Sequence, residues 1–111
     1  MKNQQTFIRT VLGDITPAEA GICYAHEHII IDESFPTVRN ELFLLNDLEK
    51  IVSELKAFYA SGGRTMVDTM PADAGRNILK LAEVSRRSGV NIVAPTGLHL
   101  EEYYLPNHWR F

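Results

Sequence analysis

The chain alternates extended and helical segments, and glycines stand where each helix returns to the next strand. Apolar runs at 22–25, 65–69 and 90–94 predict three buried strands. Between them, apolar residues recur at helical spacing over 48–59 and again over 73–87, and a glycine follows each stretch. Strand–helix–strand units are right-handed and keep their strands parallel. The fold class predicted is therefore α/β, with about three parallel strands and two intervening helices.

Capping and turn residues set the expected limits of the other elements. Thr16-Pro17 has the pattern of a short helix start. Asn46 is the expected cap of the first long helix, and Asp73 is the expected start of the second. The stretch 32–45 contains a Phe-Pro pair and no clear period, so it is predicted to be a loop.

Two histidines at the end of the first predicted strand, His26 and His28, are candidate metal ligands. Side chains alternate along a strand, so Tyr24, His26 and His28 are expected on one face, with Cys23 and Glu27 on the other. Imidazole is the commonest metal ligand near neutral pH. A catalytic zinc usually takes three protein ligands, so the pair predicts only part of a zinc site. The alternative is two strand-end histidines that hydrogen bonds satisfy.

Composition narrows the choice of partners. The 111 residues are 45% hydrophobic, which suffices for one small domain over 1–111. A formal net charge of -3 comes from scattered carboxylates, and no basic stripe is present, so no nucleic acid is expected. We also expect no membrane and a cytoplasmic protein, since neither a spanning apolar stretch nor a secretory signal is visible. The single cysteine, Cys23, is expected to act as a small hydrophobe.

Four blocks of the sequence, taken together, resemble the phosphotriesterase family of the amidohydrolase superfamily. They are GICYAHEHI at 21–29, GGRTMVD at 62–68, DAGRN at 73–77 and VNIVAPTGL at 90–98. The resemblance implies the N-terminal portion of a (β/α)8 TIM barrel. Since such barrels typically need about 250 residues, the chain is expected to be a third to a half of one. At the carboxyl mouth the family holds two divalent metals, usually zinc, bridged by a hydroxide.

The resemblance also assigns roles to residues. His26 and His28 would bind the more buried metal, while the remaining family ligands come from later strands, which are absent from this sequence. The bridging hydroxide attacks a phosphoryl or carbonyl centre. The implied substrates are small-molecule esters, namely phosphotriesters, lactones or carboxylic esters, and the implied partner of the full-length protein is a second copy in a homodimer.

Residues after the second and third predicted strands complete the candidate site. His99 stands where family members often carry an aromatic residue lining the substrate pocket, so it is a candidate substrate-binding residue. A loop histidine touching solvent or a carboxylate is the alternative. Asp68 is expected either to orient a metal ligand through a hydrogen bond or to cap a turn. Four residues near the C-terminus are weaker pocket candidates: Tyr103, Tyr104, His108 and Trp109.

Two functions are compatible with these features. The first is a zinc-dependent hydrolase of ester bonds to which this chain supplies only the first-strand ligands. The second is a catalytically inactive, truncated chain that folds partly and self-associates through open sheet edges. Two imidazoles without the remaining ligands should hold zinc poorly. The first function predicts a further segment that carries a lysine, two histidines and an aspartate, whereas a stop codon directly after Phe111 would favour the second.

Overall fold

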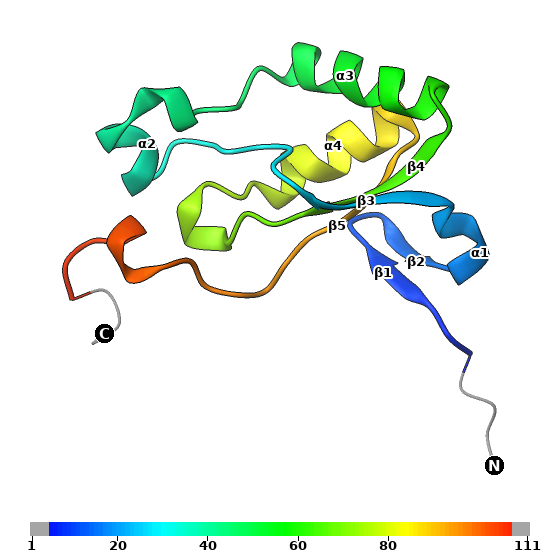
Figure 1. Ribbon diagram of the computed structural model, residues 1–111, viewed down its shortest axis with the longest axis horizontal. Coiled ribbons are helices and arrows are strands. Elements are labelled where there is room, and N and C mark those ends of the chain that lie inside the picture. Colours follow the sequence, from blue (N-terminus) through cyan, green and yellow to red (C-terminus); the bar gives the residue numbers. More distant parts are fainter. Residues whose placement is uncertain (1–4, 108–111) are drawn as a thin grey trace.

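A three-stranded parallel sheet forms the centre of the computed structural model, which describes residues 5–107. Its strands are β3 (Ile22–Glu27), β4 (Gly63–Asp68) and β5 (Asn91–Val93), in the order β3-β4-β5. The loops that follow the three strands all run toward the same side of the molecule, on the left in Figure 1. The predicted parallel sheet is therefore confirmed, and it gathers the strand ends at one edge.

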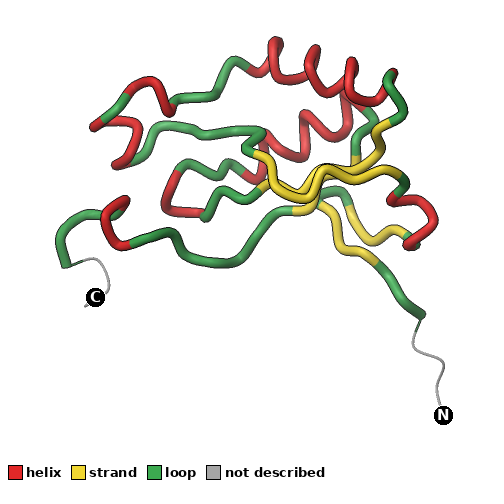
Figure 2. The backbone as a smooth tube through the Cα atoms, viewed as in Figure 1, coloured by secondary structure: helices red, strands yellow, loops and turns green. Residues whose placement is uncertain are grey.

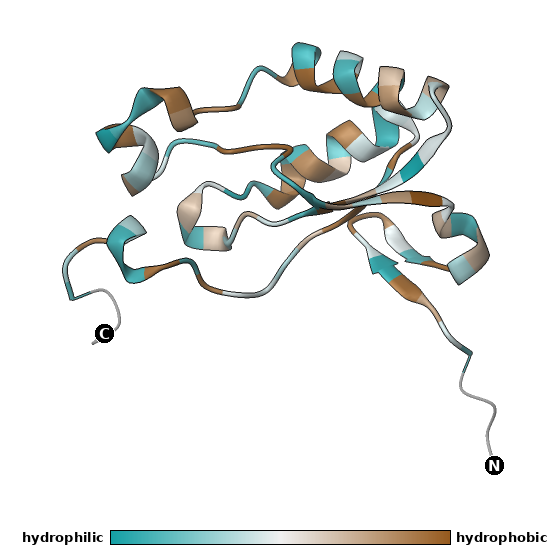
Figure 3. Ribbon diagram, in the orientation of Figure 1, coloured by the Kyte–Doolittle hydropathy of each residue, from teal (hydrophilic) through white to brown (hydrophobic). Residues whose placement is uncertain are grey.

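Helices α3 (Leu48–Ala60) and α4 (Ile78–Ser88) connect the strands. Both lie on the same face of the sheet and against each other, as the tube in Figure 2 shows. The buried side of α3 carries apolar residues, visible as brown segments in Figure 3. Ten apolar residues from strands, helices and the segment after β3 make one core: Ile29, Ile30, Ile51, Val52, Leu55, Met66, Leu81, Val84, Val90 and Ile92.

The caps of the two long helices differ from those predicted. Asp47 caps α3 by accepting a hydrogen bond from the Lys50 amide at 3.2 Å, one residue later than the predicted Asn46. Asn77 caps α4, whereas Asp73 lies in the 3-10 turn η2 (Ala72–Ala74). A carboxylate or amide at several neighbouring positions can cap a helix, so composition alone does not select among them.

The N-terminal residues form a β-hairpin. Strand β1 (Ile8–Thr10) pairs antiparallel with β2 (Gly13–Ile15), and Val11 donates its amide to Ile92 O of β5 at 2.8 Å. The predicted short helix is confirmed as α1 (Pro17–Ala20), and Thr16 closes its capping box. The hairpin thus lies against the third strand of the main sheet.

Residues 32–45 are not the plain loop that was predicted. They contain helix α2 (Phe35–Arg39) and the 3-10 turn η1 (Glu41–Phe43). A separate 3-10 turn, η3 (Glu101–Tyr103), follows β5. A capping arrangement between Ser34 and Thr37 stabilises α2, with the Ser34 amide donating to Thr37 Oγ1 at 2.8 Å. Five residues are too few to show a helical period in the sequence.

Strand β3 is an exposed edge strand rather than the buried strand predicted. Ile22 is 63% exposed and Tyr24 is 51% exposed. Three β3 residues span the distance of two in β4 between the pairs Tyr24–Met66 and Glu27–Asp68, and this irregularity interrupts the alternation of side chains. Tyr24 therefore packs on Phe58 of α3, with ring centroids 4.6 Å apart. The expectation that Tyr24 shares a face with His26 and His28 stays a prediction.

The helices are short as well as amphipathic. Within residues 5–107, none is long and apolar enough to cross a membrane.

Candidate metal and substrate site

The two candidate metal ligands lie side by side at the carboxyl end of β3. The rings of His26 and His28 are 5.6 Å apart between centroids and nearly perpendicular, at 79°. Both residues are exposed at the surface, although the His28 ring is partly covered. The histidines are thus close enough for both rings to approach one ion at the carboxyl edge of the sheet.

Met70 contacts the His28 ring from the end of the neighbouring strand. Its Sδ lies 2.8 Å from His28 Nδ1. A thioether sulfur can only accept, so a hydrogen bond here requires the proton on Nδ1 and leaves the lone pair on Nε2. Partial burial lowers the pKa of His28, and the nearby His26 and His99 lower it further. The ring is therefore biased toward the neutral form that can bind a metal.

A cavity of about 270 Å³ opens beside His28. It joins His28 to His99, which comes from the loop after β5. Its other lining residues are mostly apolar: Ile31, Pro36, Phe43, Met70, Ala74 and Tyr103. His28 and His99 thus face one mostly apolar cavity, as expected of a small-molecule site.

His99 is held by three contacts within its own loop. Its amide donates to Tyr104 Oη at 2.8 Å, and its ring packs edge-on against Tyr103 with centroids 4.1 Å apart. Its Nδ1 accepts from the Leu100 amide at 2.8 Å. Because an amide can only donate, the neutral His99 ring carries its proton on Nε2. His99 and His28 therefore hold opposite tautomers. His99 has an Nε2–H that can donate, whereas His28 has a lone pair on Nε2.

Asp68 is fully buried at the end of β4. Its Oδ1 accepts from the Met70 amide at 2.9 Å, and its Oδ2 has no partner among the described residues. Burial raises the pKa of the Asp68 carboxyl to about 6, against the lowering effect of the Met70 amide and the charge of Arg76. The Asp68–Met70 bond closes a turn, and Met70 in turn contacts the His28 ring.

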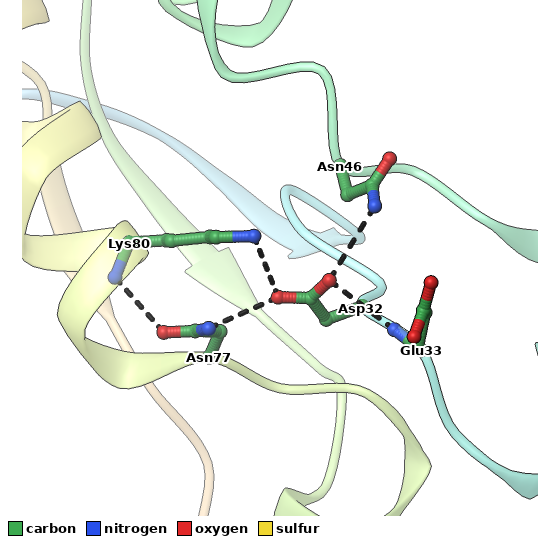
Figure 4. A network of polar contacts seen from close by, with 5 residues as sticks. All are labelled: Asp32, Glu33, Asn46, Asn77 and Lys80. Carbon is green, nitrogen blue, oxygen red and sulfur yellow. Dashed lines mark hydrogen bonds and ion pairs between the residues drawn. The ribbon is translucent and has the colours of Figure 1, made fainter.

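Asp32 anchors the loop after β3, a role that the sequence reading missed. Figure 4 shows its carboxylate among side chains from two other segments, the start of α4 and the residue just before the cap of α3. Lys80 Nζ donates at 2.8 Å, Asn77 Nδ2 at 3.0 Å and Asn46 Nδ2 at 3.5 Å. The Lys80 bond does most to lower the pKa of Asp32, to about 2. Its partners are 14 to 48 residues away in sequence, so no local pattern identifies them.

The described residues fit part of a metal centre. The His28 tautomer leaves Nε2 free, and His26 stands beside it. Across residues 5–107, however, no group of three or more His, Cys, Asp and Glu side chains is placed to hold one ion. The two histidines can therefore supply two ligands, and a complete site needs others.

Comparison with known proteins agrees with the fold and the motif positions. The sequence model of the phosphotriesterase family matches residues 6–109. The chain belongs to the phosphotriesterase family. The match contains β3 with its His-x-His motif, the cavity residues and all three strands of the parallel sheet. The predicted family is thus confirmed.

Several relatives of this family member are named as lactonases or hydrolases. A phospho-furanose lactonase of Mycoplasmopsis synoviae is 34% identical over 105 residues, covering 91% of this chain and 30% of the relative. An N-acetyltaurine hydrolase of Danio rerio is 26% identical over 123 residues, covering 85% and 35% respectively. The chain thus spans about a third of the length of these relatives.

Solved structures show the same relationship in three dimensions. A lactonase from Listeria monocytogenes superposes with a TM-score of 0.81 and 37% identity, covering 88% of this chain and 30% of that one. An amidohydrolase from Mycoplasma synoviae gives a TM-score of 0.82 and 34% identity, with 95% and 30% covered. The fold class is confirmed as the N-terminal portion of a TIM barrel, equivalent to β3 through β5 with their helices.

The predicted roles of individual residues remain predictions. The structure brings His28 and His99 to one cavity and places His26 beside His28. Tyr103 also lines the cavity, whereas Tyr104 is buried and bonded to the His99 amide. The weaker candidates His108 and Trp109 lie outside the described residues.

Proposed function

We propose that this phosphotriesterase-family chain forms part of a zinc-dependent hydrolase of ester bonds, acting on lactones or related esters. The observation that carries the proposal is the cavity shared by His28 and His99 at the carboxyl edge of the sheet. Ligands of parallel α/β folds bind at this edge. The lactonase relatives make phosphorylated sugar lactones the first substrates to test.

His26 and His28 would hold a divalent metal through nitrogen atoms, and ligands from elsewhere would complete the centre. When bound, such a metal pair supplies a hydroxide at neutral pH and polarises the bond under attack. The apolar walls of the cavity would exclude water from the hydrocarbon part of the substrate. His99 has an Nε2–H available to donate to an ester oxygen.

The test is a comparison of metal content and turnover. We would measure bound zinc in the purified protein by elemental analysis and assay a phosphorylated furanose lactone, a simple γ-lactone and paraoxon with added zinc. The double variant His26→Ala/His28→Ala should lose the metal together with any turnover. The matched control is Arg9→Ala/Asp14→Ala, which removes an exposed ion pair in the hairpin. Unchanged hydrolysis in the histidine variant would refute the proposal.

A second candidate rests on the open edge of the sheet. Ile22 and Tyr24 are exposed on β3, and no strand among the described residues pairs with its outer side. Unpaired apolar edges promote association between chains. An inactive chain of this kind would bind no stoichiometric zinc and would sediment as larger species. Substituting Ile22→Lys should then restore the monomer, whereas it should leave a zinc-dependent hydrolase active.

A further inference from the structure

Met70 is a residue for which neither the motif nor the comparisons give a role. It is 6% exposed and follows β4, two residues after the buried Asp68. Its Sδ lies 2.8 Å from His28 Nδ1. Histidines that bind metals usually donate the other ring N–H to a carboxylate or a carbonyl. Here the atom in that place is a thioether sulfur.

The segment that carries Met70 is tied to the end of β3 through Thr69 and is braced internally by Asp68. Thr69 donates to Glu27 O through its amide at 2.8 Å and its hydroxyl at 3.0 Å. Asp68 accepts the Met70 amide at 2.9 Å. Residues 68–70 therefore hold the backbone immediately before His28 as well as its ring. Because both the ring and the backbone before it are held, the Met70 contact favours one orientation of the His28 ring.

We propose that Met70 is a positioning residue for His28, accepting its Nδ1–H so that Nε2 keeps the lone pair that a metal would use. This positioning role rests on the proposed function only in that a metal is the ligand of His28. The tautomer itself is a property of the metal-free protein, because the contact is formed by this chain alone. Asp68 acts one step further away, by fixing the Met70 backbone.

His99 provides an internal reference for this assignment. The Leu100 amide donates to its Nδ1, so its proton belongs on Nε2, the reverse of His28. The two histidines face the same cavity, so solvent and pH act on both. A change in the His28 tautomer that leaves His99 unaltered therefore reports a contact local to His28 and not an effect of solvent or pH.

The experiment is long-range ¹H–¹⁵N correlation NMR of the histidine rings in the metal-free protein at pH 8, where neutral rings dominate. Wild-type His28 should show the Nδ1–H tautomer and His99 the Nε2–H tautomer. Met70→Leu keeps the volume and removes the acceptor, so His28 should shift toward a mixture while His99 stays unchanged. Met70→Gln restores an acceptor and should restore the tautomer. Met66→Leu, a buried methionine on β4 in the core, is the matched control and should change neither ring.

A His28 that already carries its proton on Nε2 in the wild type would overturn the proposal, and this measurement needs no variant to fold. An unchanged His28 in a folded Met70→Leu variant would also overturn it. Zinc titration then separates the two proposals. Met70→Leu should weaken zinc binding by about tenfold, the lower end of losses for partners of metal ligands. If His28 and His99 show the expected tautomers but the His28 Nε2 signal does not change when zinc is added, the positioning role is supported and the metal function is refuted.

Discussion

The Asp32 network makes a sharp prediction about acid stability. Replacing Asp32 with Asn removes the charge that Lys80 pairs with at 2.8 Å. The new amide N–H must also face either the Lys80 ammonium or the Glu33 backbone amide, which can only donate. The folded pKa of about 2 lies below the ordinary 3.8. At about 1.4 kcal/mol per pKa unit, this difference corresponds to about 2.5 kcal/mol of stability.

Solvent reduces that figure. The Lys80 side chain is 38% exposed, so screening brings the expected loss to about 1 to 2 kcal/mol at pH 7. The contribution of a carboxyl with a lowered pKa is fully present above the unfolded value and disappears as the pH falls through the folded value. The wild type and Asp32→Asn should therefore differ at pH 7, converge between about pH 4 and pH 2, and be equal below that.

Urea denaturation followed by circular dichroism at pH 7 and at about pH 2 measures this difference. Asp14→Asn, which removes an exposed pair with Arg9, is the control and should change stability little. A double-mutant cycle with Lys80→Met isolates the ion pair from the loop geometry. Equal destabilisation at the two pH values would show that the charge is irrelevant and would refute the reasoning.

Three further substitutions test other parts of the structure. The wild type should lose about 3 kcal/mol of unfolding free energy as the pH rises from about 4 to about 6, because the folded Asp68 carboxyl holds its proton to about pH 6 while the unfolded one releases it near 3.8. Asp68→Asn should abolish this loss. Denaturation at several pH values measures the dependence. Gly75→Ala should cost more than about 1 kcal/mol in thermal unfolding, since Gly75 has φ +108° and a Cβ there would lie 2.8 Å from Asp32 O. Leu81→Ala should lower the unfolding free energy by about 2 to 5 kcal/mol in urea, since Leu81 is fully buried, and a loss below about 1 kcal/mol would contradict its place in the core.

The order of strands and helices could be predicted from the sequence because it depends on periodicity and on glycines at helix ends. Gly89, for example, has φ +79° and closes α4, as the pattern predicted. The cap positions and the short helix α2 could not be predicted, since they depend on one or two hydrogen bonds among several equivalent candidates. The irregular pairing of β3 with β4 could not be predicted either, because no local sequence pattern marks it.

The candidate site also contains residues that the sequence could identify and residues that it could not. His26 and His28 were identified because a short motif brings both to one strand end. Asp32 and Met70 were missed because their contacts join residues from different strand–helix units. Such contacts follow from the assembled sheet and not from any local pattern.

The hydrogen bond from Val11 to Ile92 O has a consequence for folding order. It joins the end of the hairpin to the last strand of the sheet, and the two residues are 81 positions apart (92 − 11). Closing so long a loop is slow compared with forming a hairpin or a helix turn. The Val11 amide should therefore gain protection from hydrogen exchange only after β5 has joined the sheet. That single amide reports the completion of this part of the barrel, while β1 and β2 can pair much earlier.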